Sequence, residues 1–373
     1  MKARQAAGVV PEVDTPALLF DLDAMERNLS EMAAIARDAG VALRPHTKTH
    51  KCPEIARMQT DLGARGITVA KLGEAEVMAD AGFDDLLIAY PIVGESKLRR
   101  LRGLSERARV RVSLDSVEVA EGIGAVGLDL GKPMEVLVEV DTGHHRMGRP
   151  PGQPSAELVV EISRVLGVEM VGLLTHAGHA YRAGSVAEVE AIAEREAGEL
   201  VQTAERCERA GVPIREISVG STPTGRMVAA DAGVSEIRPG TYVFNDVQQM
   251  RLGTATEAAC AARVLATVVA LPWGNRFVID AGSKALSSDG GEGPPYPGRG
   301  VVAERPDLRL DALTEEHGIG TRDPAGAPLA IGDRVEVIPV HVCGCVNLFD
   351  VAYGVRDGTV DRTLEIAGRG KVG

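Results

Sequence analysis

Apolar and polar positions follow a repeating pattern along the first two thirds of the chain. Each unit is a short apolar run, a polar or glycine-rich turn and an amphipathic segment that closes on a glycine. Strands that alternate with helices at this spacing are typical of βαβ units and a parallel sheet. We expect strands at residues 42–46, 66–71, 85–90, 110–115, 134–141, 169–176, 216–221 and 236–242. Eight strands in about 200 residues predict an α/β fold, a (β/α)8 TIM-type barrel.

The pattern differs outside this region. A short strand at residues 17–22 would be a ninth, and we place it outside the barrel. From about residue 255, short strands are separated by glycine, proline and aspartate turns, which predicts a second, mostly β C-terminal domain. Residues 289–300 are predicted to form a long loop, either a lid or an interface element. The expected domains are an N-terminal arm and strand over 1–22, a barrel over 23–254 and a β domain over 255–373.

Composition and charge narrow the function classes. A net charge of −12 argues against nucleic acid and acidic membrane surfaces as partners. No run of 18 apolar residues occurs, so no membrane span is expected, and the first residues lack an apolar segment of signal-peptide length. The five cysteines are few and scattered. We therefore expect a reduced, cytoplasmic protein.

The segment RPHTKTHK at residues 44–51 is the first candidate for chemistry. It follows a short apolar run and precedes a helix-like run, so it lies where a strand turns into a helix. A lysine among other cations at the end of a buried strand should have a lowered pKa, and its free amine can then attack a carbonyl. Lys48 is thus a candidate catalytic residue, and a solvated basic turn is the alternative.

Polar residues recur where the other predicted strands end, which is the face of such barrels that carries chemistry. Ser221, Thr222, Gly240 and Thr241 follow the last two strands, where such barrels frequently hold a phosphate; ordinary glycine turns are the alternative. A phosphate opposite a reactive lysine suggests pyridoxal 5'-phosphate. The remaining candidate cofactor-binding residues at these strand ends are Arg146, His176, Tyr181 and Arg238.

The two arginines have more specific expected roles toward that cofactor. Arg146 could pair with the phenolate oxygen of its ring, and Arg238 could reach the ring nitrogen and keep it unprotonated. A surface ion pair is the alternative for each arginine. Residues 122–127 match G-x-G-x-x-G, but they lie inside a helical run and not directly after a strand, so we expect no dinucleotide site there.

His341 and Cys343 form a candidate metal pair. They lie in a strand-like run, where side chains two residues apart face the same side. An imidazole and a thiolate favour Zn2+ over Mn2+ or another divalent metal. A buried Cys/His pair without metal is the alternative. Cys345 would face the same side again, and His317 is a more remote candidate.

The segments RPHTKTHK, DTGHHRMG (141–148), THAGHAY (175–181), RPGTY (238–242) and HVC together resemble the D-serine dehydratase/D-threonine aldolase family. These are metal-activated, alanine-racemase-like pyridoxal phosphate enzymes of fold type III, and the likeness covers roughly residues 14–370. The resemblance implies an N-terminal barrel, a C-terminal β domain and a homodimer. It also implies that Lys48 is the Schiff-base lysine, that Arg146 lies near the phenolate oxygen, that Ser221, Gly240 and Thr241 match the phosphate region, and that His341, a candidate catalytic residue, binds the metal with Cys343.

The reaction stays open between two lyases. The expected substrate is a D-3-hydroxy amino acid such as D-serine or D-threonine, and the expected reaction is dehydration to a keto acid and ammonia. The cysteine ligand resembles the dehydratase branch, whereas the aldolase branch tends to carry an aspartate there. Retro-aldol cleavage to glycine and an aldehyde is the main alternative. A racemase, with Tyr296 or Tyr353 as second base, and a non-catalytic pyridoxal phosphate-binding protein that acts in homeostasis of the cofactor are further alternatives.

Overall fold

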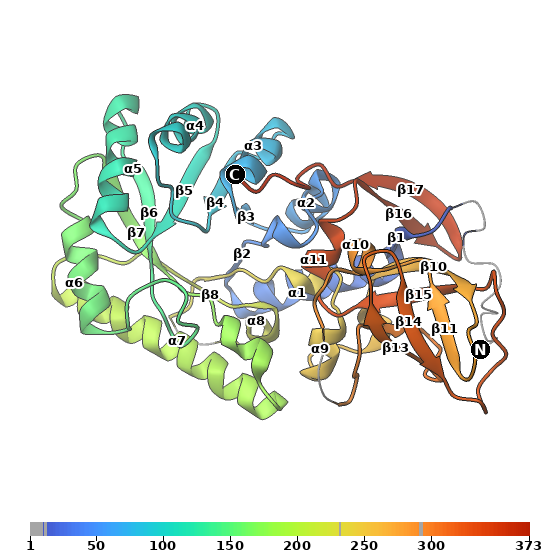
Figure 1. Cartoon of the computed structure of the whole chain (residues 1–373). Helices are drawn as coiled ribbons and strands as arrows, with labels where there is room; N and C mark the ends of the chain where they lie inside the picture. The colour runs from blue at the N-terminus through green and yellow to red at the C-terminus, as the bar shows by residue number, and fades with distance from the viewer. Residues whose placement is uncertain (1–9, 11–12, 231–232, 291–293) are drawn as a thin grey trace. The chain divides into compact units, whose positions relative to one another are not determined.

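The computed structural model describes residue 10 and residues 13–230, 233–290 and 294–373, which form two compact units (Figure 1). The barrel unit consists of Ser30–Gly240 and Gly370–Gly373, and the β unit of Met1–Leu29 and Thr241–Arg369. Most of the predicted N-terminal arm, and residues 291–293 of the predicted long loop, lie outside the described residues.

The barrel unit contains a curled parallel sheet of eight strands within the described residues, in the order β2-β9-β8-β7-β6-β5-β4-β3. An isolated bridge between His46, in the loop after β2, and Thr68 in β3 links the two edges of this sheet. Each strand falls within or next to a predicted apolar run, so the predicted fold class is confirmed. The strands are β2 (Ala42–Leu43), β3 (Ile67–Val69), β4 (Asp85–Ile88), β5 (Arg109–Leu114), β6 (Met134–Glu139), β7 (Val168–Leu174), β8 (Glu216–Val219) and β9 (Glu236–Ile237).

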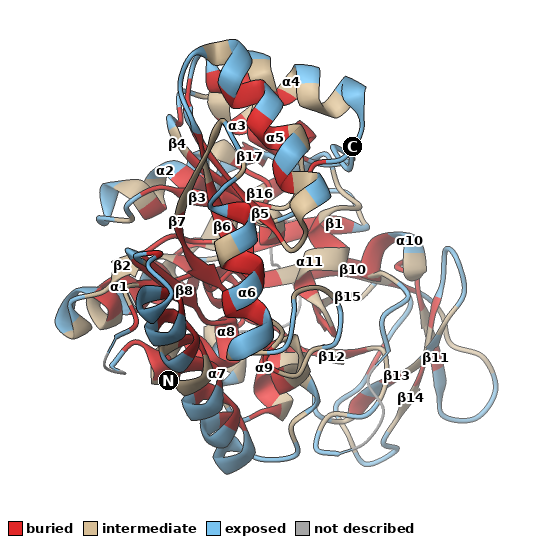
Figure 2. Cartoon of the chain, turned by 90° about the vertical axis from the view of Figure 1, so that its left-hand side faces the viewer, coloured by how far each residue is buried: buried red, intermediate tan, exposed pale blue. Residues whose placement is uncertain are grey.

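Helices follow the strands and cover the sheet with their apolar faces, as the buried and exposed positions in Figure 2 show. The longest, α7 (Val186–Arg209), buries residues spaced three and four apart, which is the pattern of an amphipathic helix. The other helices of this part of the chain are α1 (Leu22–Ala39), α2 (Pro53–Asp61), α3 (Leu72–Asp80), α4 (Glu95–Ser105), α5 (Val117–Leu130), α6 (Gln153–Ile162) and α8 (Thr222–Val228), with 3-10 turns η1 (Thr47–Thr49) and η2 (Gly178–Arg182).

The G-x-G-x-x-G segment lies inside α5, as predicted. A Cβ atom at Gly124 would collide with the Leu166 carbonyl oxygen, and one at Gly127 with the Gly167 carbonyl oxygen. These glycines therefore let the helix approach the turn before β7, and this packing accounts for the motif.

The β unit is built on a nine-stranded, mostly antiparallel sheet within the described residues, in the order β11-β14-β13-β12-β15-β10-β1-β16-β17. The predicted strand at 17–22 lies here and not in the barrel: it pairs antiparallel with β10 and parallel with β16. Its strands are β1 (Ala17–Asp21), β10 (Ala262–Ala270), β11 (Arg276–Ile279), β12 (Gly300–Val302), β13 (Leu308–Leu313), β14 (Gly318–Arg322), β15 (Arg334–Pro339), β16 (Val351–Arg356) and β17 (Thr359–Glu365).

Short helices complete the β unit: α9 (Val247–Arg251), α10 (Ser283–Leu286), α11 (Val342–Val346) and the 3-10 turns η3 (Thr241–Val243) and η4 (Glu257–Ala259). Side chains tie the start of α1 to this unit, since Asn28 Nδ2 donates to the carbonyl oxygens of Val243 and Ala259. Among the described residues, no helix is both long and apolar enough to cross a membrane.

Candidate functional site

The loop that carries Lys48 is anchored by buried ion pairs on both sides. Arg44 is fully buried, with Nε 2.7 Å from Glu236 Oε2. Lys51 is also buried, in a left-handed backbone conformation, with Nζ 3.0 Å from Glu74 Oε1. Charges this deep have partners within the fold, so the alternative of a solvated basic turn is wrong for these two residues.

Neutral polar side chains hold the middle of the same loop. Thr47 Oγ1 donates to the Thr68 carbonyl oxygen at 3.1 Å. His50 is buried; its Nδ1 accepts from the Cys52 backbone N–H at 3.1 Å, and its Nε2 lies 3.3 Å from Gln59 Oε1. Burial lowers the pKa of His50 to about 4 despite these two hydrogen bonds. The turn η1 is therefore fixed in position by its neighbours.

His46 and His176 lie close to the three cationic residues that were predicted at the strand ends. Burial lowers the pKa of each imidazole well below its usual 6.5, and the positive charges of Lys48, Arg146 and Arg238 lower both further. Three residues from different strand ends therefore lie within electrostatic range of the same two histidines. Both imidazoles are neutral at physiological pH, so they can accept hydrogen bonds without adding charge.

The two arginines have different surroundings. Arg238 is buried and donates to Ser218 Oγ and to the Thr175 carbonyl oxygen, so the surface-pair alternative is wrong for it. Arg146 is about half exposed, with Nη2 3.5 Å from Glu139 Oε1. Burial raises the pKa of Glu139, although Arg146 opposes the shift. Sequence reasoning missed Glu139, which the strand pattern hides among apolar residues.

The loops after β8 and β9, for which the sequence predicts a phosphate site, lie against each other. Thr222 Oγ1 accepts from the Gly240 backbone N–H at 3.2 Å. Ser221 caps α8 in a capping box with Thr224. A Cβ atom at Gly240 would lie 2.9 Å from Thr49 Oγ1, so the loop after β9 also touches the loop of the lysine.

The donor set of the barrel unit fits a phosphorylated carbonyl cofactor. It combines the primary amine of Lys48, the guanidinium groups of Arg146 and Arg238, and the neutral imidazoles of His46 and His176. Positive charges and neutral hydrogen-bonding groups together suit an anionic ligand. Tyr181 lies half-buried in η2. His144, which the sequence reasoning did not select, meets the ring of His176 edge to face at 5.7 Å.

The candidate metal pair lies in the β unit, but not on a strand. Strand β15 ends at Pro339, His341 is the N-cap of α11, and Cys343 lies in the first turn of that helix. The prediction that His341 and Cys343 lie on one strand is wrong, because the backbone becomes helical at Val342. The two side chains nevertheless touch. Burial lowers the pKa of His341, but the Cys343 thiol and the charges of Asp246 and Asp289 outweigh burial and raise it to about 9.

Two carboxylates accompany this pair. Asp289 Oδ2 lies 3.0 Å from His341 Nδ1. Asp246 is fully buried and accepts from the Val342 backbone N–H at 3.0 Å. Thr241, which was predicted to bind phosphate, has its hydroxyl oxygen 3.7 Å from Cys343 Sγ. Sequence reasoning missed both carboxylates; the position of Asp246 directly before a helix was the available signal.

The other two metal candidates lie elsewhere. Cys345 is buried and donates to the Ala285 carbonyl oxygen at 3.1 Å, so it does not join the pair. His317 is exposed and contacts Thr314. Within the described residues, no three or more histidine, cysteine or carboxylate side chains gather in an arrangement able to hold a metal ion. The imidazole of His341 and the thiol of Cys343 are donors of the kind that zinc prefers.

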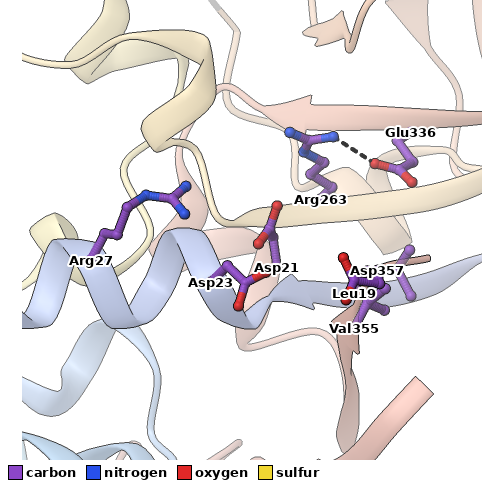
Figure 3. A pocket seen from close by; sticks show the side chains of 8 residues that line it. All are labelled: Leu19, Asp21, Asp23, Arg27, Arg263, Glu336, Val355 and Asp357. Carbon is purple, nitrogen blue, oxygen red and sulfur yellow. Dashed lines mark hydrogen bonds and ion pairs between the residues drawn. The ribbon is translucent and has the colours of Figure 1, made fainter. Parts of the chain in front are cut away.

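A separate cavity of about 140 Å³ lies in the β unit, and Figure 3 shows its lining. Its charges are partly paired, with Arg263 Nη1 2.8 Å from Glu336 Oε2. None of the predicted site residues lines it. The lining residues are Leu19, Asp21, Asp23, Arg27, Arg263, Glu336, Val355 and Asp357.

Two family models match the chain: "Alanine racemase, N-terminal domain" over residues 20–247 and "Putative serine dehydratase domain" over residues 261–355. D-threo-3-hydroxyaspartate dehydratase of Delftia sp. (strain HT23) is 36% identical over 366 residues, which cover 93% of this chain and 96% of that protein. D-threonine aldolase of Arthrobacter sp. is 32% identical over 370 residues, which cover 98% of this chain and 95% of that protein.

Solved structures agree with these matches. The crystal structure of D-threonine aldolase from Filomicrobium marinum superposes with a TM-score of 0.91 at 33% identity, covering 98% of this chain and 99% of that one. Structures of D-threo-3-hydroxyaspartate dehydratase, among them that of the Delftia sp. HT23 enzyme, superpose with TM-scores of 0.85 to 0.87 at 36% identity, covering 95% of this chain and 95 to 97% of those chains. They include alanine mutants of a histidine and of a cysteine two residues later, the latter in the metal-free form.

Proposed function

The chain belongs to the alanine-racemase-like, fold type III family of pyridoxal phosphate enzymes that carry a serine dehydratase domain, and on that premise we propose that it is a D-amino acid lyase. The proposed reaction is removal of water from a D-3-hydroxy amino acid such as D-serine or D-threonine. The products would be a keto acid and ammonia. The observation that supports dehydration is the contact between His341 and Cys343, because a cysteine, and not an aspartate, would then be the second metal ligand.

Lys48, Arg146, His176 and Arg238 would hold the cofactor, with Tyr181 and the loops at Ser221, Thr222, Gly240 and Thr241 as further binding residues. Pyridoxal phosphate, when bound, supplies a carbonyl for the substrate amine and a ring that makes the substrate Cα–H acidic. The Lys48 amine would take that proton and hold it. The imidazoles of His46 and His176 are neutral, so Arg146 and Arg238 would supply the positive charge that attracts an anionic substrate carboxylate.

His341 and Cys343 would hold a divalent metal, and we propose Zn2+ because of the soft thiolate. Such an ion supplies Lewis acidity toward a hydroxyl group, which is otherwise a poor leaving group. Asp289, at Nδ1 of His341, would leave Nε2 of that ring for the metal. The imidazole must lose its proton on binding, so metal affinity should fall as pH falls.

Incubation with D-threonine tests the reaction. Dehydration gives 2-oxobutyrate and ammonia, whereas the rival aldolase reaction, favoured by the similarity to D-threonine aldolase, gives glycine and acetaldehyde. Turnover of L-threonine alone contradicts both. Loss of optical rotation in alanine that a chelator does not affect would point to a racemase.

Borohydride reduction and peptide mapping test the role of Lys48. The label should fall on Lys48, and Lys48→Ala should lose both the label and activity. Lys132→Ala is a matched control in the barrel unit, because Lys132 is not one of the predicted site residues and its Nζ donates to the Ser105 carbonyl oxygen. A label on another lysine contradicts the assignment. The homodimer that the family resemblance implies is tested by light scattering after gel filtration.

A further inference from the structure

One buried carboxylate clamps the backbone of the candidate metal pair. Asp246 is fully buried and is the N-cap of α9, where its Oδ1 accepts from the Gln249 backbone N–H at 3.0 Å. Its Oδ2 accepts from the Val342 backbone N–H at 3.0 Å. The same side chain therefore satisfies one N–H at the start of α9 and another at the start of α11.

A second bond completes the clamp. The Gln248 backbone N–H donates to the Val340 carbonyl oxygen at 3.2 Å. His341 lies between Val340 and Val342, so its backbone is held by α9 on both sides. The extended backbone of His341, with φ −133° and ψ 104°, ends at the helix that carries Cys343.

We propose that Asp246 is a positioning residue that sets the spacing of the His341 and Cys343 side chains and so gives the pair its affinity for a divalent metal ion. This inference rests on the proposed function, because it assumes that the pair binds metal. Two ligands on a five-residue helix and its cap have few constraints of their own. The bond from Val342, the residue between them, keeps the helix from fraying where the ligands sit.

Zinc titration of the cofactor-loaded protein by calorimetry tests the proposal. Asp246→Asn keeps the size of the side chain but turns one acceptor into a donor that faces an N–H. We expect the zinc dissociation constant to rise about tenfold or more, as for other groups that orient metal ligands. Ser185→Ala is the matched control: it removes the N-cap bond to the Glu188 N–H of α7 in the barrel unit and should leave zinc affinity unchanged.

Val342→Pro is a second variant: it removes the N–H that donates to Asp246 and also replaces the buried Val342 side chain. Proline is favoured at the first position of a helix, and the extended backbone of His341 tolerates a following proline. Val342→Pro should also raise the zinc dissociation constant. If Asp246→Asn does not fold, the proposal is tested with Val342→Pro alone.

The outcomes separate this inference from the proposed function. If His341→Ala loses zinc but a folded Asp246→Asn or Val342→Pro protein binds it as tightly as the wild type, only the positioning role is overturned. If His341→Ala and the wild type bind zinc equally, the metal pair is overturned together with it. A loss of affinity in Ser185→Ala as large as in Asp246→Asn would assign the effect to general destabilisation and contradict the proposal.

Discussion

Replacement of Arg44 by methionine should destabilise the barrel unit strongly. Arg44 is fully buried between two carboxylates, with Nε 2.7 Å from Glu236 Oε2 and Nη1 2.7 Å from Asp85 Oδ1. Removal of one partner from a buried ion pair typically costs about 3–5 kcal/mol, because the other charge is left without compensation. In the variant, Asp85 Oδ1 would keep Arg111 Nη2 at 3.1 Å, and Glu236 would keep a hydrogen bond from Ser218. We therefore expect the free energy of unfolding to fall by the smaller of these amounts, about 3 kcal/mol.

Urea unfolding followed by far-ultraviolet circular dichroism is the suitable assay. The single tryptophan, Trp273, is 85% exposed and lies in the β unit, so its fluorescence would report on the wrong part of the chain. Arg99→Met is the matched control, because Arg99 pairs with Glu95 on an exposed face of α4. It should change the free energy of unfolding by at most about 0.5 kcal/mol.

The stability lost in Arg44→Met should also depend on pH. Burial alone would raise the pKa of Glu236, but attraction to Arg44 and hydrogen bonds from Ser218 and Arg44 lower it below its usual 4.5. A lowered carboxyl pKa contributes stability that is present above the usual pKa and is lost as pH falls through the lowered one. The difference between wild type and Arg44→Met should therefore shrink in acid. Equal losses in Arg44→Met and Arg99→Met at neutral pH would refute the reasoning.

Three further changes have expected outcomes. Gly66→Ala should also destabilise the barrel unit in the urea assay, because its Cβ would collide with the Arg44 guanidinium; no loss would contradict this. His50→Gln should flatten the fall in stability between about pH 6.5 and pH 4, since buried His50 binds its proton only near 4 whereas the unfolded residue binds it near 6.5; an unchanged pH profile would contradict this. Gly240→Ala should lower bound pyridoxal phosphate, read by absorbance, because its Cβ lies 3.0 Å from a backbone oxygen of the lysine's loop, whereas Gly198→Ala, with open space around it, should not.

The sequence predicts those features that depend on local pattern. The eight apolar runs became the eight strands of the parallel sheet because a buried strand is rich in apolar residues. The buried polar residues within these strands, such as Arg111, Ser218 and Glu236, do not follow from that pattern. The polar residues after those runs meet around His46 and His176 because parallel strands end at one edge.

Long-range partners account for what the sequence did not predict. The buried state of Arg44 depends on Glu236, 192 residues away, and a window of a few residues shows only a basic turn. The segment around His341 alternates like a strand, but its backbone turns into a helix where Asp246, 96 residues before Val342, accepts the first N–H. Local alternation alone therefore does not predict this turn, which has tertiary hydrogen-bond partners far away in the sequence.

Side-chain hydrogen bonds help to close the barrel sheet in the region where few backbone pairs join its strands. Strands β2 and β9 are two residues long, and a single bridge joins the loop after β2 to β3. Ser218, Glu236 and Arg44 link neighbouring strands in that same region through buried hydrogen bonds. Mobile ions screen buried charges far less than exposed ones. The ring should therefore hold together at high ionic strength, under conditions that weaken the many exposed ion pairs on the helices around it.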